Sequence, residues 1–276
     1  MKRVPPSPPT ESPAACGIVA HALVETRLTA IAALRDRPAP LGAPALPSRF
    51  LRHCDEQAVV GVHAVLRVLA DRGAVVGDVG RHAVIGASCQ IGRLSAARTL
   101  AGLATGGGVG VSPHVVPQCS LHSVAGAVSV GLRMHGPHVG VGGGADSFAE
   151  GLFAAASLLR ASPAADAPPC VWLVATEWDT EPVLDDSGAP VSDPVCRGLA
   201  LAIEPASSSG LSLSVHVPAA RREATASATG LADFARALDM CREGAALVSW
   251  SIECPWGAEI RVTRRAGTAS RLRGAA

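Results

Sequence analysis

The sequence of 276 residues contains no tyrosine, no asparagine and a single lysine, Lys2. These three residue types have AT-rich codons, whereas the abundant alanine, glycine, arginine and valine have GC-rich codons. We therefore attribute the bias to a GC-rich genome, and it excludes no chemistry. The sequence also lacks an excess of charge of either sign, since it has 24 lysine and arginine residues and 23 aspartate and glutamate residues. Only the C-terminal stretch "RVTRRAGTASRLRG" is strongly basic, so the sequence predicts no nucleic-acid-binding face.

Long apolar runs are missing as well. No run reaches the 18 or so residues that a membrane-spanning helix requires, so we expect no membrane span. The N-terminal "MKRVPPSPPTESPAA" has too many prolines and too short an apolar run for a signal peptide. We therefore expect a cytoplasmic protein in a reducing compartment.

The cysteines lack the spacing of a metal site. The eight cysteines include no CxxC pair, and no histidine lies at metal-ligand spacing from any of them. Free cysteine commonly behaves as a small buried hydrophobe. We accordingly expect no metal and no cofactor.

The distribution of proline divides the chain. Residues 1–48 form a Pro-rich N-terminal segment, in which connectors at 1–15 and 35–48 flank a possible first strand. Residues 49–276 are expected to form one α/β domain, because a chain of this length can bury roughly three quarters of its unfolded surface.

The periodicity of apolar residues alternates between helical and extended. Helices are expected at 55–73, which is amphipathic, and at 93–104, 120–134, 146–161 and about 229–242. Strands are expected at 82–89, 138–143, 170–177, 197–205 and 211–217, and a final antiparallel pair is expected around Pro255-Trp256-Gly257. This alternation predicts an α/β layered fold in which helices cover a mixed sheet.

The glycine run "GVGGGADS" at 140–147 raises the possibility of a nucleotide site. It lacks a Walker lysine, but Gly140 to Ala145 match G-x-G-x-x-A after an expected strand. Asp166 stands at the approximate distance of a ribose-binding acid, although in a Pro/Ala-rich loop. A nucleotide-binding α/β protein is therefore one alternative. The same glycines would also let a strand and a helix pack closely without any ligand.

Ser147 stands near the same strand-to-helix turn, where hydrolases carry a nucleophile. The elbow motif G-x-S-x-G is incomplete, because alanines occupy both glycine positions. Asp146 and Ser147 more simply resemble residues that cap the N-terminus of a helix.

Residues 112–159 resemble the N-terminal half of β-ketoacyl synthases, which have the thiolase fold. Gly126, Leu132, Gly136 and Pro137 follow that family's pattern "A-G-x-V/I-x-x-x-L-x-x-x-G-P", and a short strand and a small-residue helix follow. The likeness extends over roughly residues 50–205. It implies a thiolase-like layered fold with a reduced or half-length ketosynthase architecture.

The resemblance also implies an active-site cysteine at the turn after the short strand. Counting along the family pattern from Gly136 puts Ala145 at that position, and a methyl group cannot attack a thioester. The family's site further implies two histidines from the C-terminal half, whereas His216 is the only histidine after Ala145. The resemblance therefore implies a ketosynthase-like chain without its nucleophile.

Two other nucleophiles keep an enzymatic alternative open. Ser147, or Cys119 with His122 as its base, would allow a condensing or acyl-transfer reaction of the same superfamily. Cys119 also fits the ordinary role of a core hydrophobe, and His122 fits that of a hydrogen-bonding group at an interface.

The resemblance thus implies a non-catalytic subunit of the chain-length-factor type. It would pair with an active β-ketoacyl synthase in fatty-acid, polyketide or aryl-polyene biosynthesis, through the sheet edge and region 112–135. The sequence leaves a heterodimer and a homodimer both open, and contact with acyl carrier protein would be indirect. The expected walls of an acyl tunnel are Val139, Val141, Phe148, Leu152 and Phe153.

Overall fold

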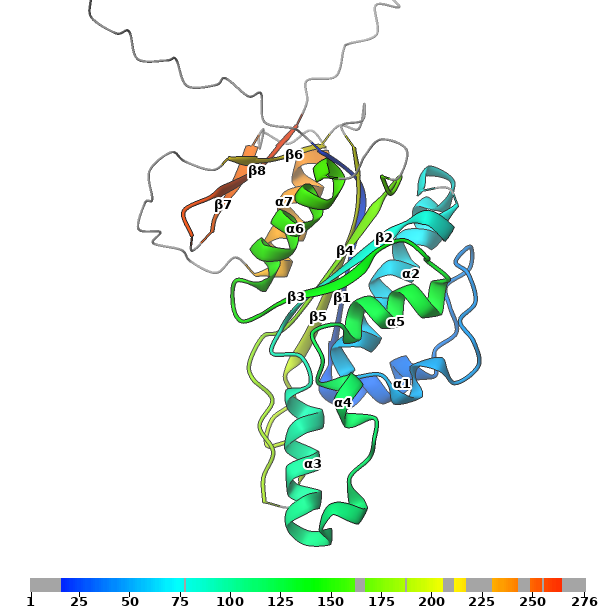
Figure 1. Ribbon diagram of the computed structural model, residues 1–276, viewed down its shortest axis with the longest axis vertical. Helices are drawn as coiled ribbons and strands as arrows, with labels where there is room; N and C mark the ends of the chain where they lie inside the picture. The colour runs from blue at the N-terminus through cyan, green and yellow to red at the C-terminus, as the bar shows by residue number, and fades with distance from the viewer. Residues whose placement is uncertain are drawn as a thin grey trace, which may run out of the picture.

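The computed structural model describes residues 16–76, 78–161, 167–186, 188–205, 211–216, 230–242, 249–254 and 256–264. The connector at 1–15, Asp166 and the basic residues after 264 lie outside this range. Within it, helices pack on both faces of one mixed sheet (Figure 1). The predicted α/β layered fold is confirmed.

Eight strands form the sheet in the order β3-β2-β4-β5-β1-β6-β8-β7. Strands β3 and β4 run parallel to β2, and all the other neighbours pair antiparallel. The strands are β1 (Cys16–Arg27), β2 (Ala83–Cys89), β3 (His138–Gly143), β4 (Val171–Trp178), β5 (Val195–Pro205), β6 (Leu211–His216), β7 (Ser249–Glu253) and β8 (Glu259–Arg264).

The possible first strand is real and central. β1 lies between β5 and β6 and pairs with β5 along its length, from Cys16↔Pro205 to Arg27↔Val195. β1 therefore belongs to the same sheet as the strands that follow residue 48. The flanking prolines conceal the strand in the sequence, but both hydrophobic clusters include residues of β1, so the strand contributes to the core on both faces of the sheet.

One face of the sheet carries α2 (Glu56–Val76) and α5 (Ser123–Leu132), with the short α1 (Ile31–Arg35) beside α2. The opposite face carries α6 (Ser147–Ala161) and α7 (Leu231–Arg242). Each face has its own hydrophobic cluster. β2 and β4 are covered on both faces, which explains their almost uninterrupted runs of buried residues.

α2 differs from the amphipathic helix expected at 55–73. Its residues from Glu56 to Leu66 are all buried, and Arg67 is the first exposed one. The helix lies between the sheet, α1 and α5, so its first turns have no solvent-facing side. Gly61 allows this packing, because a Cβ there would lie 2.9 Å from a methyl carbon of Val174.

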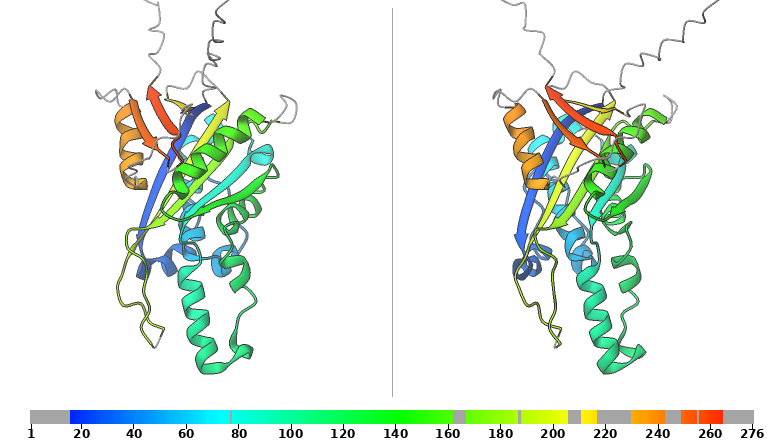
Figure 2. Two further views of the ribbon diagram at one scale, coloured as in Figure 1. Left: turned by 60° about the vertical axis from the view of Figure 1, so that its left-hand side comes forward. Right: turned by 90° about the vertical axis from the view of Figure 1, so that its left-hand side faces the viewer.

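A slender projection extends beyond the sheet. It consists of α3 (Arg93–Gly106) and the 3₁₀ turn Gly108–Gly110, which extend away from the layered body (Figures 1 and 2). The short α4 (Val115–Gln118) returns to the body, where Gln118 donates to the carbonyl of His53. Leu94 is the one buried side chain of α3. Because α4 leads into α5 and α5 packs on the edge strand β3, the projection borders that edge of the sheet.

Candidate functional site at the β3–α6 turn

The turn between β3 and α6 depends on glycines. Gly142 and Gly143 have φ angles of 89° and 117°, in the region that favours glycine. A Cβ on Gly142 would also lie 2.5 Å from the Cβ of Ser147. The glycines therefore serve a tight strand-to-helix connection, which needs no phosphate to explain it.

Ala145 lies at the exposed tip of this turn. That Ala145 corresponds to the attacking cysteine of the ketosynthases stays a prediction from the resemblance. Its methyl group has no lone pair and no acidic proton, so the tip offers no nucleophile.

Ser147 begins α6 and lies beneath the tip. The side chain is 2% exposed. Its hydroxyl accepts a hydrogen bond from the Gly143 N–H at 3.2 Å, and it lies 3.0 Å from the carbonyl oxygen of Ser88 and also close to that of Gly144. These bonds tie the turn to β2, whereas a capping hydroxyl would accept from an N–H of the first turn of the helix.

A buried polar chain continues below the turn. The hydroxyl of Thr176 lies 2.8 Å from both the Ser88 hydroxyl and the Gln57 side-chain oxygen. The Gln57 amide in turn donates to the carbonyl of Cys89 at 2.8 Å. The chain joins β2, β4 and α2 behind the turn. The sequence holds one signal for this network, because each of two apolar strands has a polar residue near its end. These two residues, Ser88 and Thr176, are register partners.

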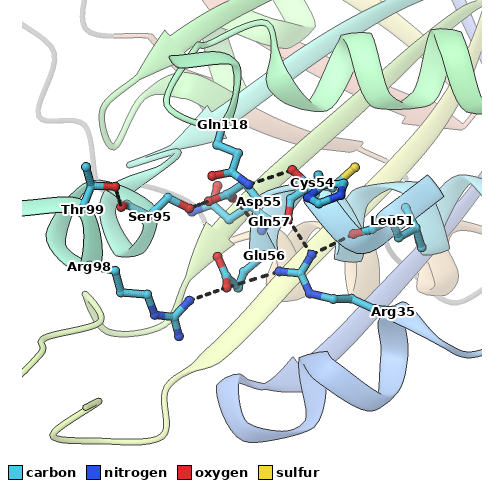
Figure 3. Close-up of polar contacts among 11 residues, drawn as sticks. Arg35, Leu51, Cys54, Asp55, Glu56, Gln57, Ser95, Arg98, Thr99 and Gln118 are labelled. Atoms are coloured by element: carbon cyan, nitrogen blue, oxygen red, sulfur yellow. Dashed lines mark hydrogen bonds and ion pairs between the residues drawn. The ribbon is translucent and has the colours of Figure 1, made fainter. Parts of the chain in front are cut away.

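A second polar cluster lies at the N-terminus of α2 (Figure 3). Asp55 accepts from the backbone N–H of Gln57 at 2.8 Å and from the Ser95 hydroxyl at 3.3 Å. Burial, reinforced by the charge of Glu56 next to it, raises the pKa of Asp55 to about 7. This carboxyl group is therefore partly protonated near neutral pH.

Glu56 joins three helices in the same cluster. One of its carboxylate oxygens lies 3.3 Å from Arg35 and 2.9 Å from Arg98. Arg35 also donates to the carbonyls of Leu51 and Cys54 (Figure 3). Arg98 belongs to α3, so the carboxylate anchors the base of the projection to α1 and α2. Within the described residues, these contacts give the buried polar side-chain atoms of the cluster hydrogen-bond partners, so no ligand is needed to explain them. The second carboxylate oxygen of Glu56 is the exception.

Cys119 and His122 do not form a nucleophile–base pair in the described structure. The thiol of Cys119 lies 3.5 Å from the carbonyl of Gly92, and burial raises its pKa, which disfavours the reactive thiolate. The imidazole of His122 is instead hydrogen-bonded to His138, with 2.9 Å between Nε2 and Nδ1. Burial, and then the neighbouring His138, lower the pKa of His122.

A cavity of about 280 Å³ lies beside His122, between α5, α4 and the 3₁₀ turn Phe50–His53. The cavity is mostly apolar. His53 also lines it, and the His53 ring stacks on the ring of His114 with 4.5 Å between the centroids. The lining residues are Phe50, His53, Cys54, Pro117, Gln118, Ser120, His122, Ser123, Gly126, Ala127 and Val130. Sequence reasoning identified only His122 among them as a site residue, because the cavity joins segments distant along the chain.

The five expected tunnel residues occupy three different environments. Val139 is exposed on the edge strand and Val141 is half-buried beside it. Phe148 and Leu152 are buried in the core, where Phe148 meets Phe234 edge-on. Phe153 is 38% exposed and faces Trp256. Their role in a tunnel stays a prediction.

In the parts of the chain that the structure covers, no group of three or more His, Cys, Asp or Glu side chains could hold a metal ion. No helix there is long and apolar enough to cross a bilayer.

Comparison with known proteins gives a match in structure alone. No family model and no curated protein sequence matches the chain. A solved ketosynthase in complex with its chain length factor, from Xenorhabdus doucetiae, matches with a TM-score of 0.56 and 16% identity, over 90% of this chain and 99% of that chain. A β-ketoacyl synthase from Burkholderia phymatum matches with a TM-score of 0.48 and 15% identity, over 86% and 71%. The chain therefore has the thiolase-like fold of the ketosynthases.

Proposed function

We propose that the chain is a non-catalytic, ketosynthase-like subunit of the chain-length-factor type that pairs with an active β-ketoacyl synthase. The observation that carries this proposal is Ala145, at the exposed tip of an otherwise intact strand–turn–helix connection. A chain that keeps the glycine turn and lacks the nucleophile can still shape a partner's site. Fatty-acid, polyketide or aryl-polyene biosynthesis is the proposed setting.

The other possible nucleophiles do not favour catalysis. The Ser147 hydroxyl is buried and hydrogen-bonded within the turn, and no histidine is hydrogen-bonded to it in the described structure. Cys119 has a raised pKa and is not joined to His122. An activated nucleophile requires a base within hydrogen-bonding distance or a lowered pKa, and neither residue has one.

The edge of the sheet supports pairing with another subunit. β3 is hydrogen-bonded to β2 on one side and is the last strand in the sheet order. Large apolar side chains are exposed near it, namely Leu121, Val130 and Val139. An open edge with apolar neighbours is normally covered, because it would otherwise invite aggregation.

Incubation with an acyl-loaded carrier protein tests the absence of catalysis. Intact-mass spectrometry of the full chain should show no acyl adduct after a time that fully acylates an active ketosynthase. A stable adduct on Ser147 or Cys119 would instead establish the acyl-transfer alternative, and peptide mapping would identify the residue. Co-expression with an active ketosynthase, sought first among the genes that neighbour this one, should give a complex that survives gel filtration.

The nucleotide-binding alternative has its own test. A thermal-shift screen with nucleoside triphosphates and dinucleotides should leave the melting temperature unchanged, because close packing explains Gly140 and Gly142 and a positive φ angle explains Gly143. A nucleotide that raises the melting temperature in proportion to its concentration would reinstate that alternative.

A further inference from the structure

The projection is held to the rest of the chain by few contacts. Leu94 is the one buried side chain of α3, and residues 102–106 are all exposed. A helix of 14 residues is marginal on its own in water. The position of α3 therefore depends on the contacts that its first turns make with the layered body.

Two adjacent carboxyl groups at the N-terminus of α2 supply the buried polar contacts (Figure 3). The hydroxyl of Ser95 lies 3.3 Å from the carboxyl of Asp55, and Arg98 lies 2.9 Å from the carboxylate of Glu56. Both acids are held away from water, since Asp55 is 2% exposed and Glu56 is 6% exposed. The base of the projection is thus attached to a buried pair of acids.

The two carboxyl groups differ in their partners. One oxygen of Glu56 contacts both Arg35 and Arg98. In the described structure no cation lies within ion-pair distance of Asp55, which instead accepts from a backbone N–H and a hydroxyl. Burial and an adjacent negative charge both favour the neutral form of a carboxyl group. When the pair holds one proton, Asp55 is therefore the member that carries it.

The hydrogen-bond balance of the pair also favours a retained proton. The second carboxylate oxygen of Glu56 is buried and has no hydrogen-bond partner among the described residues. An ionised Asp55 adds acceptor capacity where a donor is already lacking, whereas a protonated Asp55 brings a donor. The pKa of Asp55 agrees, because burial and then the charge of Glu56 raise it to about 7.

The other groups around Asp55 keep their charge near neutral pH. Those that face it from the surrounding elements are Cys54, Glu56, Arg35 on α1, Arg98 on α3, Cys119 after α4 and Cys196 on β5. Burial raises the pKa of all three thiols, so they stay neutral. The guanidinium groups stay protonated and are paired with Glu56. Asp55 is therefore the group whose charge changes.

We propose that the protonated carboxyl of Asp55 attaches α3 to α2, and that loss of this proton weakens the attachment of the projection. When the base of α3 moves away, water reaches the carboxyl, which then releases its proton. The attached form thus binds more protons than the detached form. By linkage, the attachment is strongest in acid and is lost progressively as the pH rises through about 7. The inference does not rest on the proposed function, because it concerns contacts within this chain.

Hydrogen–deuterium exchange of the full chain at about pH 5.5 and about pH 8.0 tests this inference, after correction for the intrinsic exchange rates. The amides at 96–100, in the first turns of α3, report the attachment, and those of β4 report unfolding of the whole sheet. Protection at 96–100 should be lower than in β4 and should fall by about fivefold or more at the higher pH.

Three variants separate the proton from the other contacts of α3. Asp55→Asn keeps an oxygen for the backbone N–H but has no titratable proton, so protection at 96–100 should be equal at the two pH values. Arg98→Gln should lower this protection at both pH values and leave the pH dependence. Glu181→Gln is the matched control, because Glu181 is an acid that contacts α3 through Arg93 at 3.3 Å but is partly exposed. This variant should keep the pH dependence of the wild type, and circular dichroism confirms that each variant is folded.

Other results would overturn the inference. If residues 96–100 keep their protection while that of β4 falls, the proton stabilises the whole fold and does not attach the projection. If Asp55→Asn retains the pH dependence, another group is responsible. If residues 96–100 lack protection at both pH values, the carboxyl pair does not hold α3 at all.

Discussion

Gly140 of the edge strand packs directly against the carbonyl of Leu121, where the chain enters α5, and any Cβ at residue 140 would overlap that carbonyl. This approach brings β3 and α5 together into one face. A methyl group cannot be accommodated by rotating a side chain, because backbone atoms of residues 121 and 122 form the obstacle.

Gly140→Ala should therefore lower the free energy of unfolding by about 2 kcal/mol or more, through overpacking. Urea denaturation of the purified variant measures the change. Gly144→Ala is the matched control, since a Cβ there meets nothing within 4 Å. It should be close to neutral, and an equal loss in both variants would show that the β3–α5 contact is not responsible.

Thr176→Val should destabilise the chain by about 1–3 kcal/mol, because it removes the hydrogen bonds of Thr176 to the side-chain oxygen of Gln57 and to the Ser88 hydroxyl, both buried. Valine nearly preserves the volume, so the loss reports the hydrogen bonds. Thr180→Val provides a comparison at an exposed position, where the hydroxyl bonds only to Asp179. Equal stability of the two variants in thermal denaturation would contradict the importance of the network.

Asp55→Asn should remove a pH dependence of stability. The folded state raises the pKa of Asp55 to about 7 from the ordinary 3.8, so the folded chain holds a proton that the unfolded chain has released. This stabilising contribution is complete below about pH 4 and is lost as the pH rises through 7. Between these limits the wild type should lose more stability with rising pH than the asparagine variant, which keeps a capping oxygen.

Denaturation midpoints at half-unit pH intervals measure this difference. Asp78→Asn is a suitable control, because Asp78 also caps a helical turn but at an exposed position. Parallel stability curves for the wild type and Asp55→Asn would show that Asp55 is charged in the folded protein throughout this range.

Ala145→Cys should create a rapidly alkylated thiol, because residue 145 is exposed at the tip of the turn. Ser147→Cys, two residues further on, should react far more slowly, because residue 147 is buried. Iodoacetamide labelling followed by intact-mass spectrometry compares the two. Native Cys54, Cys89 and Cys119 have raised pKa values and should contribute a slow background. Similar labelling of both variants would contradict the geometry of the turn.

Val130→Asp should disrupt pairing with a ketosynthase while leaving the chain folded. Val130 is 65% exposed on α5, so a carboxylate there costs little in the free subunit but is desolvated in a complex. Gel filtration of the co-expressed proteins measures the loss. Val183→Asp is the control on a different surface, where Val183 is 55% exposed in the loop between β4 and β5. If both variants retain the complex, the interface lies elsewhere.

Apolar periodicity predicted most of the elements, since α6 and the strand pair β7–β8 lie close to their expected positions. It did not predict that the first turns of α2 are buried on every side, because burial on a second side depends on which helix packs there. It also gave little weight to β1, since a strand between proline-rich stretches resembles a connector until its partners β5 and β6 are known.

The sequence by itself determined that the tip of the β3–α6 turn carries a methyl group and that residues 79–145 carry no carboxylate, because both are matters of residue identity. Only the tertiary structure decided which groups meet. His122 and His138 are 16 residues apart, and Ser88 and Thr176 are 88 apart, so their hydrogen bonds follow from the close approach at Gly140 and from the register of β2 and β4. Contacts of this kind depend on strand order and register, which no local pattern specifies.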